Sequence, residues 1–318
     1  MSSAVQAPSL PAGYTQRPAT LDDVEVVGAL IGRSEAALGL REEDATSFLR
    51  WAMALPYVEL QRDSILVHGD GEPAAFGGVL RDPAAVGSSL DWFGVIDPAH
   101  LGRSLGDRIV RWALAVASVR EPDEGPFVVR GNIPAPDAAA HDLLTRHGLT
   151  HARTMWTMHR EVADAEPVAA PAGVTIRGFQ TGRDERAFWE VSEASFEGHY
   201  GHVPSPFESW EGEWYRSDDW DPDRVLLGER DGVVVGELAW VGSGADGYIA
   251  SVGVLEPHRG HGIASALLRT AFVDIAAAGF TSATLSVDTE NATGAVGLYR
   301  SAGMDVVRES HIFERLGR

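Results

Sequence analysis

The sequence contains no cysteine and no lysine. Without cysteine the chain cannot form disulfides, bind metal through thiolates or form a covalent cysteine intermediate. Without lysine it cannot contain the Gly-Lys-Ser/Thr of a Walker A phosphate loop. All 26 cationic side chains are therefore arginine, against 46 acidic ones, for a net charge of −20. Such a charge disfavours nucleic acids and anionic membranes as partners, although solubility alone explains it as well.

Long apolar runs are also missing, and the first 16 residues lack the basic start and the apolar stretch of a signal peptide. We therefore expect a cytoplasmic protein. The chain has 318 residues, 44% of them hydrophobic and 23% charged, which is more than one ordinary core requires. This composition predicts two globular domains.

Four blocks of sequence recur in the same order in the two halves of the chain. They begin at Tyr14 and Val174, at Ser64 and Arg224, at Ile96 and Val254, and at His141 and Val296. The second pair contains Asp70-Gly71 and Asp231-Gly232, a strong signal for a tight hairpin. Between the halves, residues 163–173 are rich in alanine and proline, as linkers are.

We therefore predict a disordered N-terminus (1–12), a first domain (13–162), a linker (163–173) and a second domain (174–318). Each half reads as a strand, a helical stretch, a three-stranded meander, then helix, strand, helix and strand. The predicted class is α/β (α+β), with a mixed, mostly antiparallel sheet flanked by helices.

The stretch "VLEPHRGHGIASALLRTAF", residues 254–272, joins a predicted strand to a predicted helix through a glycine-rich loop. The first N–H groups of a helix have no partners inside the helix, so such a junction can hold an anion, usually phosphate. Gly260 and Gly262 would let the backbone approach the ligand closely, and Arg259 could add a charge-assisted contact. A dinucleotide fingerprint fits poorly, because Ser265 stands where the third glycine belongs. An ordinary helix N-terminus is the simpler alternative.

Two motifs together resemble the GNAT N-acetyltransferase family. Arg259-Gly260-His261-Gly262-Ile263-Ala264 fits the family's acyl-CoA loop without a gap. Further on, the family's second signature is matched by Asn291, Leu298, Tyr299 and Gly303. Two positions depart from it: Met304 replaces the usual aromatic residue, and Ala295 lies one residue after the place of the signature's alanine. The tandem layout resembles mycothiol synthase and related two-domain GNAT proteins.

The resemblance implies an acetyl-CoA-dependent N-acetyltransferase acting on the primary amine of a small molecule, with its chemistry in the second domain and no metal. It also implies roles for particular residues. The main chain of Val252, Gly253 and Val254 would pair with the pantetheine arm, Arg259, Gly260, His261, Gly262, Ile263, Ala264 and Ser265 would hold the pyrophosphate, Asn291 would contact the cofactor, and Tyr299 would be the general acid.

The general base stays open among three alternatives. Members of the family often carry a glutamate at the start of the strand before the phosphate loop, where this chain has Tyr248 with Asp246 just before it. Glu237, in the middle of the preceding strand, is a second carboxylate that could face the cleft. Water relayed by backbone groups could replace both.

Substrate contacts in this family come largely from the first helices and the loop between them. Here that region contains, among acidic residues, a mixture suited to a cationic amine: His199, Tyr200, His202, Trp210, Trp214 and Trp220. Trp210 and Trp214, at helical spacing, fit the core equally well. Two histidines without a third ligand do not predict a metal site.

The first half has lost the corresponding residues. Leu101 stands in place of Arg259, Ser104 in place of Gly262, and Leu144 in place of Tyr299. We expect a catalytically silent domain that lines the substrate cleft, although Gly102 and Gly106 leave room for residual cofactor binding. The rival hypotheses are a non-catalytic acyl-CoA-binding or scaffold protein and a mycothiol-synthase-like or protein N-acetyltransferase. The oligomeric expectation is a monomer or a homodimer.

Overall fold

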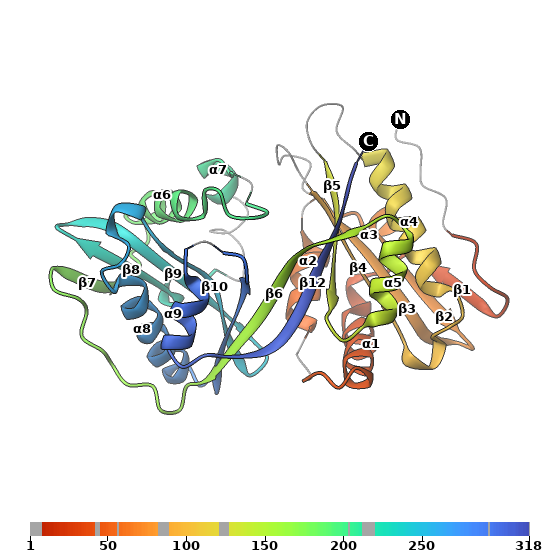
Figure 1. Ribbon diagram of the computed structural model, residues 1–318, viewed down its shortest axis with the longest axis horizontal. Helices are drawn as coiled ribbons and strands as arrows, with labels where there is room; N and C mark the ends of the chain where they lie inside the picture. The colour runs from red at the N-terminus through yellow and green to blue at the C-terminus, as the bar shows by residue number, and fades with distance from the viewer. Residues whose placement is uncertain are drawn as a thin grey trace. The chain divides into compact units, whose positions relative to one another are not determined.

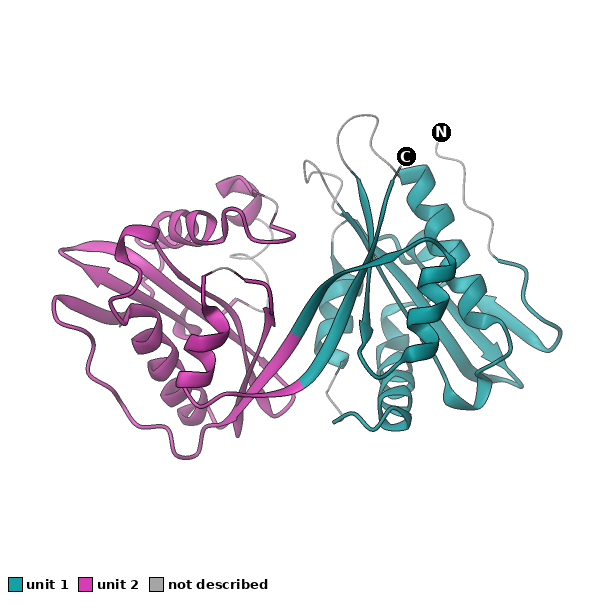
Figure 2. Ribbon diagram, viewed as in Figure 1, with its two compact units in different colours: residues 1–155, 308–318 teal, residues 156–307 magenta. Residues whose placement is uncertain are grey.

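The computed structural model describes residues 8–41, 45–55, 57–81, 89–120, 127–202, 204–211, 220–291 and 293–317 (Figure 1). The chain divides into two compact units, residues 1–155 with 308–318, and residues 156–307 (Figure 2). The alanine- and proline-rich stretch 163–173 lies inside the second unit, and the end of the chain belongs to the first. Of the N-terminal stretch 1–12, residues 1–7 lie outside the described residues, whereas Pro8 accepts a hydrogen bond from Gln16 Nε2 at 2.7 Å.

The first unit is a sheet with helices on both faces. Its elements are β1 (Tyr14–Arg17), η1 (Leu21–Asp23), α1 (Val24–Ala37), α2 (Thr46–Ala54), α3 (Leu60–Asp63), β2 (Ser64–Gly69), β3 (Glu72–Leu80), β4 (Ser89–Ile96), η2 (Pro98–His100), α4 (Leu105–Arg120), β5 (Val128–Pro134), α5 (Ala138–Arg146) and the start of β6 (Thr150–Glu161). Apolar residues of α4 and α5 form one core with the sheet, and those of α1 and α2 form another. The strands of this sheet follow the order β1-β2-β3-β4-β5-β12.

The second unit repeats this plan. It contains β7 (Val174–Gly178), α6 (Glu185–Phe196), α7 (Phe207–Trp210), η4 (Pro222–Arg224), β8 (Val225–Arg230), β9 (Val233–Ser243), β10 (Asp246–Val254), η5 (Glu256–His258), α8 (Ile263–Ala277), β11 (Ser282–Asp288), α9 (Ala295–Ser301) and the start of β12 (Asp305–Leu316). Its strand order is β6-β11-β10-β9-β8-β7. Helices α8 and α9 pack on one face and α6 and α7 on the other. Pairing is antiparallel from β7 to β10 and parallel between β10 and β11, so the predicted mixed, mostly antiparallel sheet is confirmed.

The two halves exchange their last strands. From Ser310 to Leu316, β12 pairs antiparallel with β5, and Phe313 lies in the core of the first unit. In return, Met158 of β6 lies in the core of the second unit. The last strand of each sheet therefore comes from the other half of the sequence, which local sequence patterns do not reveal.

The same local devices recur in both units, as the sequence repeat predicts. Arg17 pairs with both carboxylate oxygens of Asp23 at 2.7 and 2.6 Å, and Arg177 pairs in the same way with Asp184 at 2.6 and 3.0 Å. Each pair ties the first strand of its unit to the start of the first helix. Within the described part of the chain, no helix has both the length and the apolar character that crossing a membrane requires.

The Asp-Gly turns of the two hairpins are also equivalent. Asp70 and Gly71 have φ of +53° and +88°, and Asp231 and Gly232 have φ of +52° and +80°. Positive φ at both central residues is the geometry of a type I′ turn, which matches the twist of the strands that it joins. The predicted hairpins are therefore confirmed.

Candidate active site

Strand β10 separates from its parallel neighbour β11 in the middle of the second unit. Their pairing runs from Asp246↔Ser282 to Tyr248↔Thr284, after which both strands continue without pairing to each other. On the other side, the register between β9 and β10 shifts between Ile249 and Ser251, which marks a bulge at Ala250. A bulge leaves its extra residue outside the ladder and re-aims the local backbone. The separated strands thus present main-chain groups of β10 that the sheet does not use.

Glu237 lies on β9 beside this bulge and is fully buried. Its Oε2 accepts a hydrogen bond from Ser251 Oγ at 2.8 Å, while its Oε1 has no hydrogen-bond partner within the described part of the chain. Burial raises the pKa of Glu237 to about 7, and the Ser251 hydrogen bond opposes that rise. A carboxyl with this pKa can take up a proton near neutral pH, as a general base must.

Gly253 creates the space around the free oxygen of Glu237. A Cβ at this position would lie 2.8 Å from Glu237 Oε1 and 2.9 Å from Ser195 Oγ. Ser195, near the end of α6, is 4% exposed, and its hydroxyl oxygen also has no hydrogen-bond partner within the described residues. A glycine is required here because both polar atoms approach the backbone of β10 too closely for any side chain.

Tyr299 of α9 is buried and lies close enough to Glu237 to interact with it electrostatically. Burial, followed by the charges of Glu237 and Tyr248, raises the pKa of Tyr299 to about 12. The phenol therefore keeps its proton throughout the neutral range and can serve as an acid. Tyr248 and Glu237 occupy one face of the β9–β10 ladder, since Tyr248 pairs with Val241, four residues along β9 from Glu237.

The loop between β10 and α8 has the predicted bare backbone. Gly260 and Gly262 have φ of +76° and +79°, and a Cβ on Gly260 would meet nothing within 4 Å. The helix closes its first bond from Ala266 N to Gly262 O, so the N–H groups of Ile263, Ala264 and Ser265 have no acceptor inside α8. The N-terminus of α8 is therefore open to an anion.

The side chains of this loop have different surroundings. Arg259 donates from Nε to Val254 O at 2.9 Å and from an Nη to Ser195 O at 3.3 Å, so it ties the loop to β10 and α6. His261 is exposed, with its Nδ1 2.8 Å from Arg259 O. The side chain of Ile263 lies in the core against Gly228, so only its backbone is available to a ligand.

The two predicted base candidates are far apart. Asp246 pairs with Ser243 at the hairpin end of β10, whereas Glu237 pairs with Gly253 near the other end, about 20 Å along the strand. The hydroxyl of Ser282 donates to the carboxylate of Asp246. Asp246 therefore does not join Glu237, Ser251 and Tyr299 in one site.

Asn291 follows β11 and accepts a hydrogen bond from Thr293 N at 2.8 Å through Oδ1.

The predicted substrate residues follow the end of α6. His202 Nε2 lies 3.4 Å from Glu193 Oε2 of that helix, and the ring of His199 packs on Phe196 at 5.2 Å between centroids. Tyr200, between them, is half-buried. Trp210 lies in the core with Phe188, which confirms the core interpretation, while Trp214 lies outside the described residues. No group of side chains suited to holding a metal ion occurs within the described ranges.

Comparisons with known proteins agree with this geometry. The model of the acetyltransferase (GNAT) family matches residues 188–304. The mycothiol acetyltransferase of Thermobispora bispora is 31% identical over 298 residues, covering 89% of this chain and 93% of the relative. The chain belongs to the GNAT acetyltransferase family. It is therefore an acetyl-CoA-dependent acyltransferase, and the predicted fold, family and enzyme class are confirmed.

Other relatives extend this picture of a tandem GNAT protein. The mycothiol acetyltransferase of Thermomonospora curvata is 30% identical and covers 76% of this chain and 78% of its own. A GCN5-related N-acetyltransferase from Sphaerobacter thermophilus has a TM-score of 0.83 and 31% identity, with 97% of each chain covered. A tandem GNAT protein from the clavulanic acid biosynthesis pathway shares the fold, with a TM-score of 0.68, 14% identity and coverage of 96% of this chain and 99% of its own.

The first GNAT unit lacks the polar groups of the second. The β2–β3–β4 registers place Phe76 where Glu237 stands and Phe93 where Ser251 stands, with the two rings 5.5 Å apart. The β3–β4 ladder keeps a continuous register from Ala75↔Ile96 to Leu80↔Asp91, so no counterpart of the Ala250 bulge occurs between these described residues. Ser104 keeps the left-handed backbone of Gly262, with φ of +62°. These differences favour a first unit without acyl-transfer chemistry.

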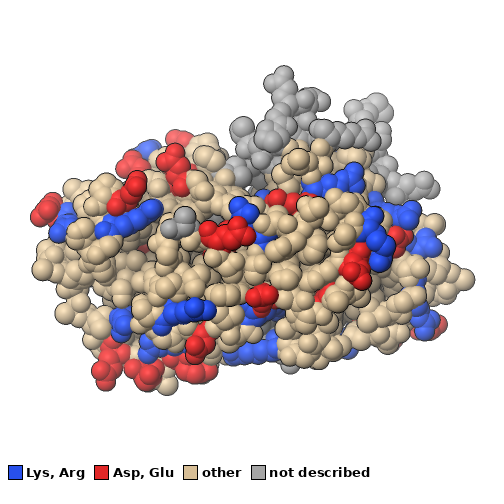
Figure 3. Space-filling model, in the orientation of Figure 1, with Lys and Arg blue, Asp and Glu red and all other residues tan. Residues whose placement is uncertain are grey.

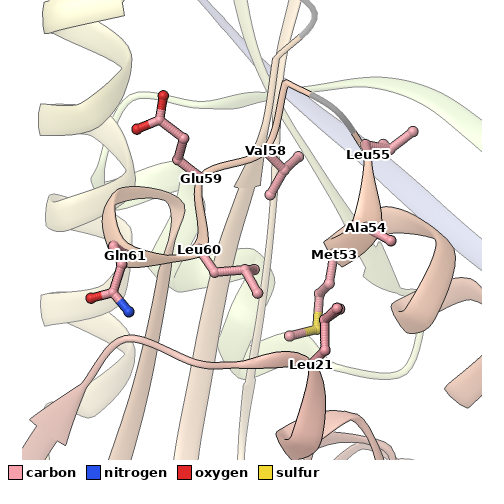
Figure 4. A pocket seen from close by; sticks show the side chains of 8 residues that line it. All are labelled: Leu21, Met53, Ala54, Leu55, Val58, Glu59, Leu60 and Gln61. Atoms are coloured by element: carbon pink, nitrogen blue, oxygen red, sulfur yellow. The ribbon is translucent and has the colours of Figure 1, made fainter.

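A pocket of the first unit, shown in Figure 4, lies away from Phe76, Phe93 and Ser104. It has a volume of about 480 Å³ and is lined by Leu21, Met53, Ala54, Leu55, Val58, Glu59, Leu60 and Gln61. Its lining is mostly aliphatic and combines no nucleophile with a base.

Figure 3 shows acidic and basic side chains interspersed on the face drawn there. The net charge of −20 is therefore not gathered into one acidic field on that face.

Proposed function

We propose that the second unit transfers the acetyl group of acetyl-CoA to the primary amine of a small molecule, with Glu237 as general base and Tyr299 as general acid. The observation that carries this proposal is the buried carboxylate of Glu237, which keeps one oxygen unpartnered beside the bulge of β10. An acid and a base with pKa values on either side of neutrality, at about 12 and about 7, can both act near pH 8.

The backbone around β10 and α8 fits the donor. From Val252 to Val254, β10 pairs with β9 but not with β11, so its edge toward β11 offers main-chain groups to an extended amide-containing arm, and the N-terminus of α8 offers N–H groups to its pyrophosphate. The left-handed backbone at Gly262 turns the chain into the helix without a side chain over the nest. The proposed donor to the thioester oxygen is a backbone N–H at the Ala250 bulge. Asn291, which follows β11, is a proposed contact for the same arm.

The chain's residues would balance the protons of the reaction. The neutral amine forms a bond to the acetyl carbon, and its departing proton passes to the free oxygen of Glu237. The carbon–sulfur bond breaks, and the leaving sulfur takes the phenolic proton of Tyr299. Solvent returns a proton from Glu237 to Tyr299, so that each turnover yields one amide and one thiol.

The acceptor is proposed to be a small amine. The relatives from Thermobispora bispora and Thermomonospora curvata are named mycothiol acetyltransferases, so mycothiol lacking its acetyl group is the first acceptor to test. His199, Tyr200 and His202, after the end of α6, are the proposed contacts for its polar groups. The exchange of strands leaves the first unit as an integral part of the protein, and we propose that it has no acyl-transfer chemistry of its own.

The test is calorimetric titration of the purified protein with acetyl-CoA, followed by an acetylation assay over a panel of small primary amines. Gly262→Glu places a bulky anion on a left-handed residue in the proposed nest and should abolish donor binding. Ser104→Glu makes the matched change in the first unit and should leave binding intact. Binding that survives Gly262→Glu but not Ser104→Glu would move the donor site to the first unit. No binding by the wild type would favour a scaffold.

A further inference from the structure

Ser195 and Glu237 present two unsatisfied oxygens to one small space over β10. Ser195 Oγ lies 2.9 Å, and Glu237 Oε1 2.8 Å, from the position of a Cβ on Gly253. The two oxygens are therefore no more than about 6 Å apart. Both are buried, and neither has a hydrogen-bond partner within the described residues. Leaving a buried polar atom without a hydrogen bond costs free energy. Two such oxygens close together, Ser195 Oγ and Glu237 Oε1, therefore indicate a ligand that bonds to both.

The surroundings hold Ser195 in place. Arg259 of the phosphate-loop motif donates both to Ser195 O at 3.3 Å and to Val254 O at 2.9 Å, which fixes the end of α6 against the end of β10. Ser251 already uses the other oxygen of Glu237. The remaining two oxygens thus belong to side chains whose own backbone and partners are set by the fold, as a binding site requires.

We propose that Ser195 is a binding residue for the acceptor amine, whose nitrogen donates one N–H to Ser195 Oγ and one to Glu237 Oε1. This inference rests on the proposed function of Glu237. A neutral primary amine has two N–H donors and one lone pair, so this arrangement engages both hydrogens and turns the lone pair toward the acetyl carbon. A secondary amine has a single N–H and cannot satisfy both oxygens. The pair of oxygens therefore selects primary amines.

The experiment compares Ser195→Cys and Ser195→Ala with the wild type, using the best acceptor of the amine panel and its N-methyl counterpart. Cysteine fills the same space, but its sulfur is a weak acceptor. For the primary amine, we expect kcat/KM to fall about tenfold in Ser195→Cys and Ser195→Ala. For the N-methyl amine the fall should be small, so the preference for the primary amine shrinks even in Ser195→Cys. The Kd for acetyl-CoA should stay at the wild-type value.

Ser192→Ala, on the same helix and half-buried, is the matched control and should leave all these values unchanged. An active wild type whose Ser195 variants keep the full preference for the primary amine would overturn this inference alone. A loss of acetyl-CoA affinity together with a fall in Tm, to the same extent in both Ser195 variants, would also overturn it. Such a result would indicate a structural role for Ser195. A wild type that acetylates no amine in the panel would overturn the proposed function and this inference together.

Discussion

Glu237 accepts a hydrogen bond from Ser251 at 2.8 Å, and the rings of Phe76 and Phe93 occupy the same two register positions in the first unit. One fold thus carries a hydrogen-bonded polar pair in one copy and an aromatic pair in the other. Aromatic rings in these positions stabilise the core but cannot accept a proton. The asymmetry of the two units therefore comes from the side chains that face α6 and α1 and from the Ala250 bulge, while the order and direction of the strands are the same.

The rate should rise with pH through the titration of Glu237. This residue must be ionised to accept a proton, and burial raises its pKa to about 7. We expect kcat/KM for the donor to increase tenfold per pH unit below about 7 and to level off above it. Glu237→Gln should lose that dependence together with at least about 100-fold in kcat. A wild-type profile that is flat from pH 5.5 to 8 would assign the proton to another group.

The same burial should make Glu237 costly for stability at high pH. The folded-state pKa of about 7 lies above the ordinary value of 4.5, so the folded protein binds a proton that the unfolded chain has released. The contribution of Glu237 to stability is therefore full below pH 4.5 and is lost as the pH rises from there through 7, by roughly 3 kcal/mol at ~1.4 kcal/mol per unit.

Urea unfolding of the wild type and Glu237→Gln tests this difference. At pH 8 the variant should be the more stable protein, by up to about 3 kcal/mol, whereas at pH 4 the two should be nearly equal. A variant less stable than the wild type at pH 8 would mean that the ionised carboxylate has stronger partners than Ser251 alone.

Tyr299→Phe should separate chemistry from binding. The substitution removes the proposed acid and keeps the packing of the ring, which is 8% exposed. We expect kcat to fall about 100-fold or more, while calorimetry gives an unchanged Kd for acetyl-CoA. Unchanged turnover with any accepted amine would exclude the phenol as the acid.

The exchange of β12 should make Phe313 a core residue of the first unit. Phe313→Ala removes a side chain that is 5% exposed, at an expected cost of about 3–5 kcal/mol. Hydrogen exchange followed by mass spectrometry should show lost protection in β2, β3 and α4, with protection retained in α8. Val306→Ala, on an exposed part of the same strand, is the control. Lost protection confined to α8 would contradict the observed pairing.

Sequence alone determined the features that are local. The Asp-Gly turns, the glycine loop from Arg259 to Gly262 and the position of Tyr299 all depend on residues close together in the chain, where backbone freedom and spacing leave a pattern. The internal repeat predicted two copies of one fold, and the loss of Arg259, Gly262 and Tyr299 counterparts predicted that one copy differs in function.

Only the tertiary structure decided what depends on register. Glu237 and Asp246 look equivalent in the sequence, but the β9–β10 ladder buries one beside Ser251 and leaves the other at the hairpin end. The sequence does not single out Ser195, because it lies near Glu237 only when α6 packs over Gly253. The exchange of β6 and β12 is equally invisible, since strand partners are chosen by long-range burial rather than by neighbouring residues.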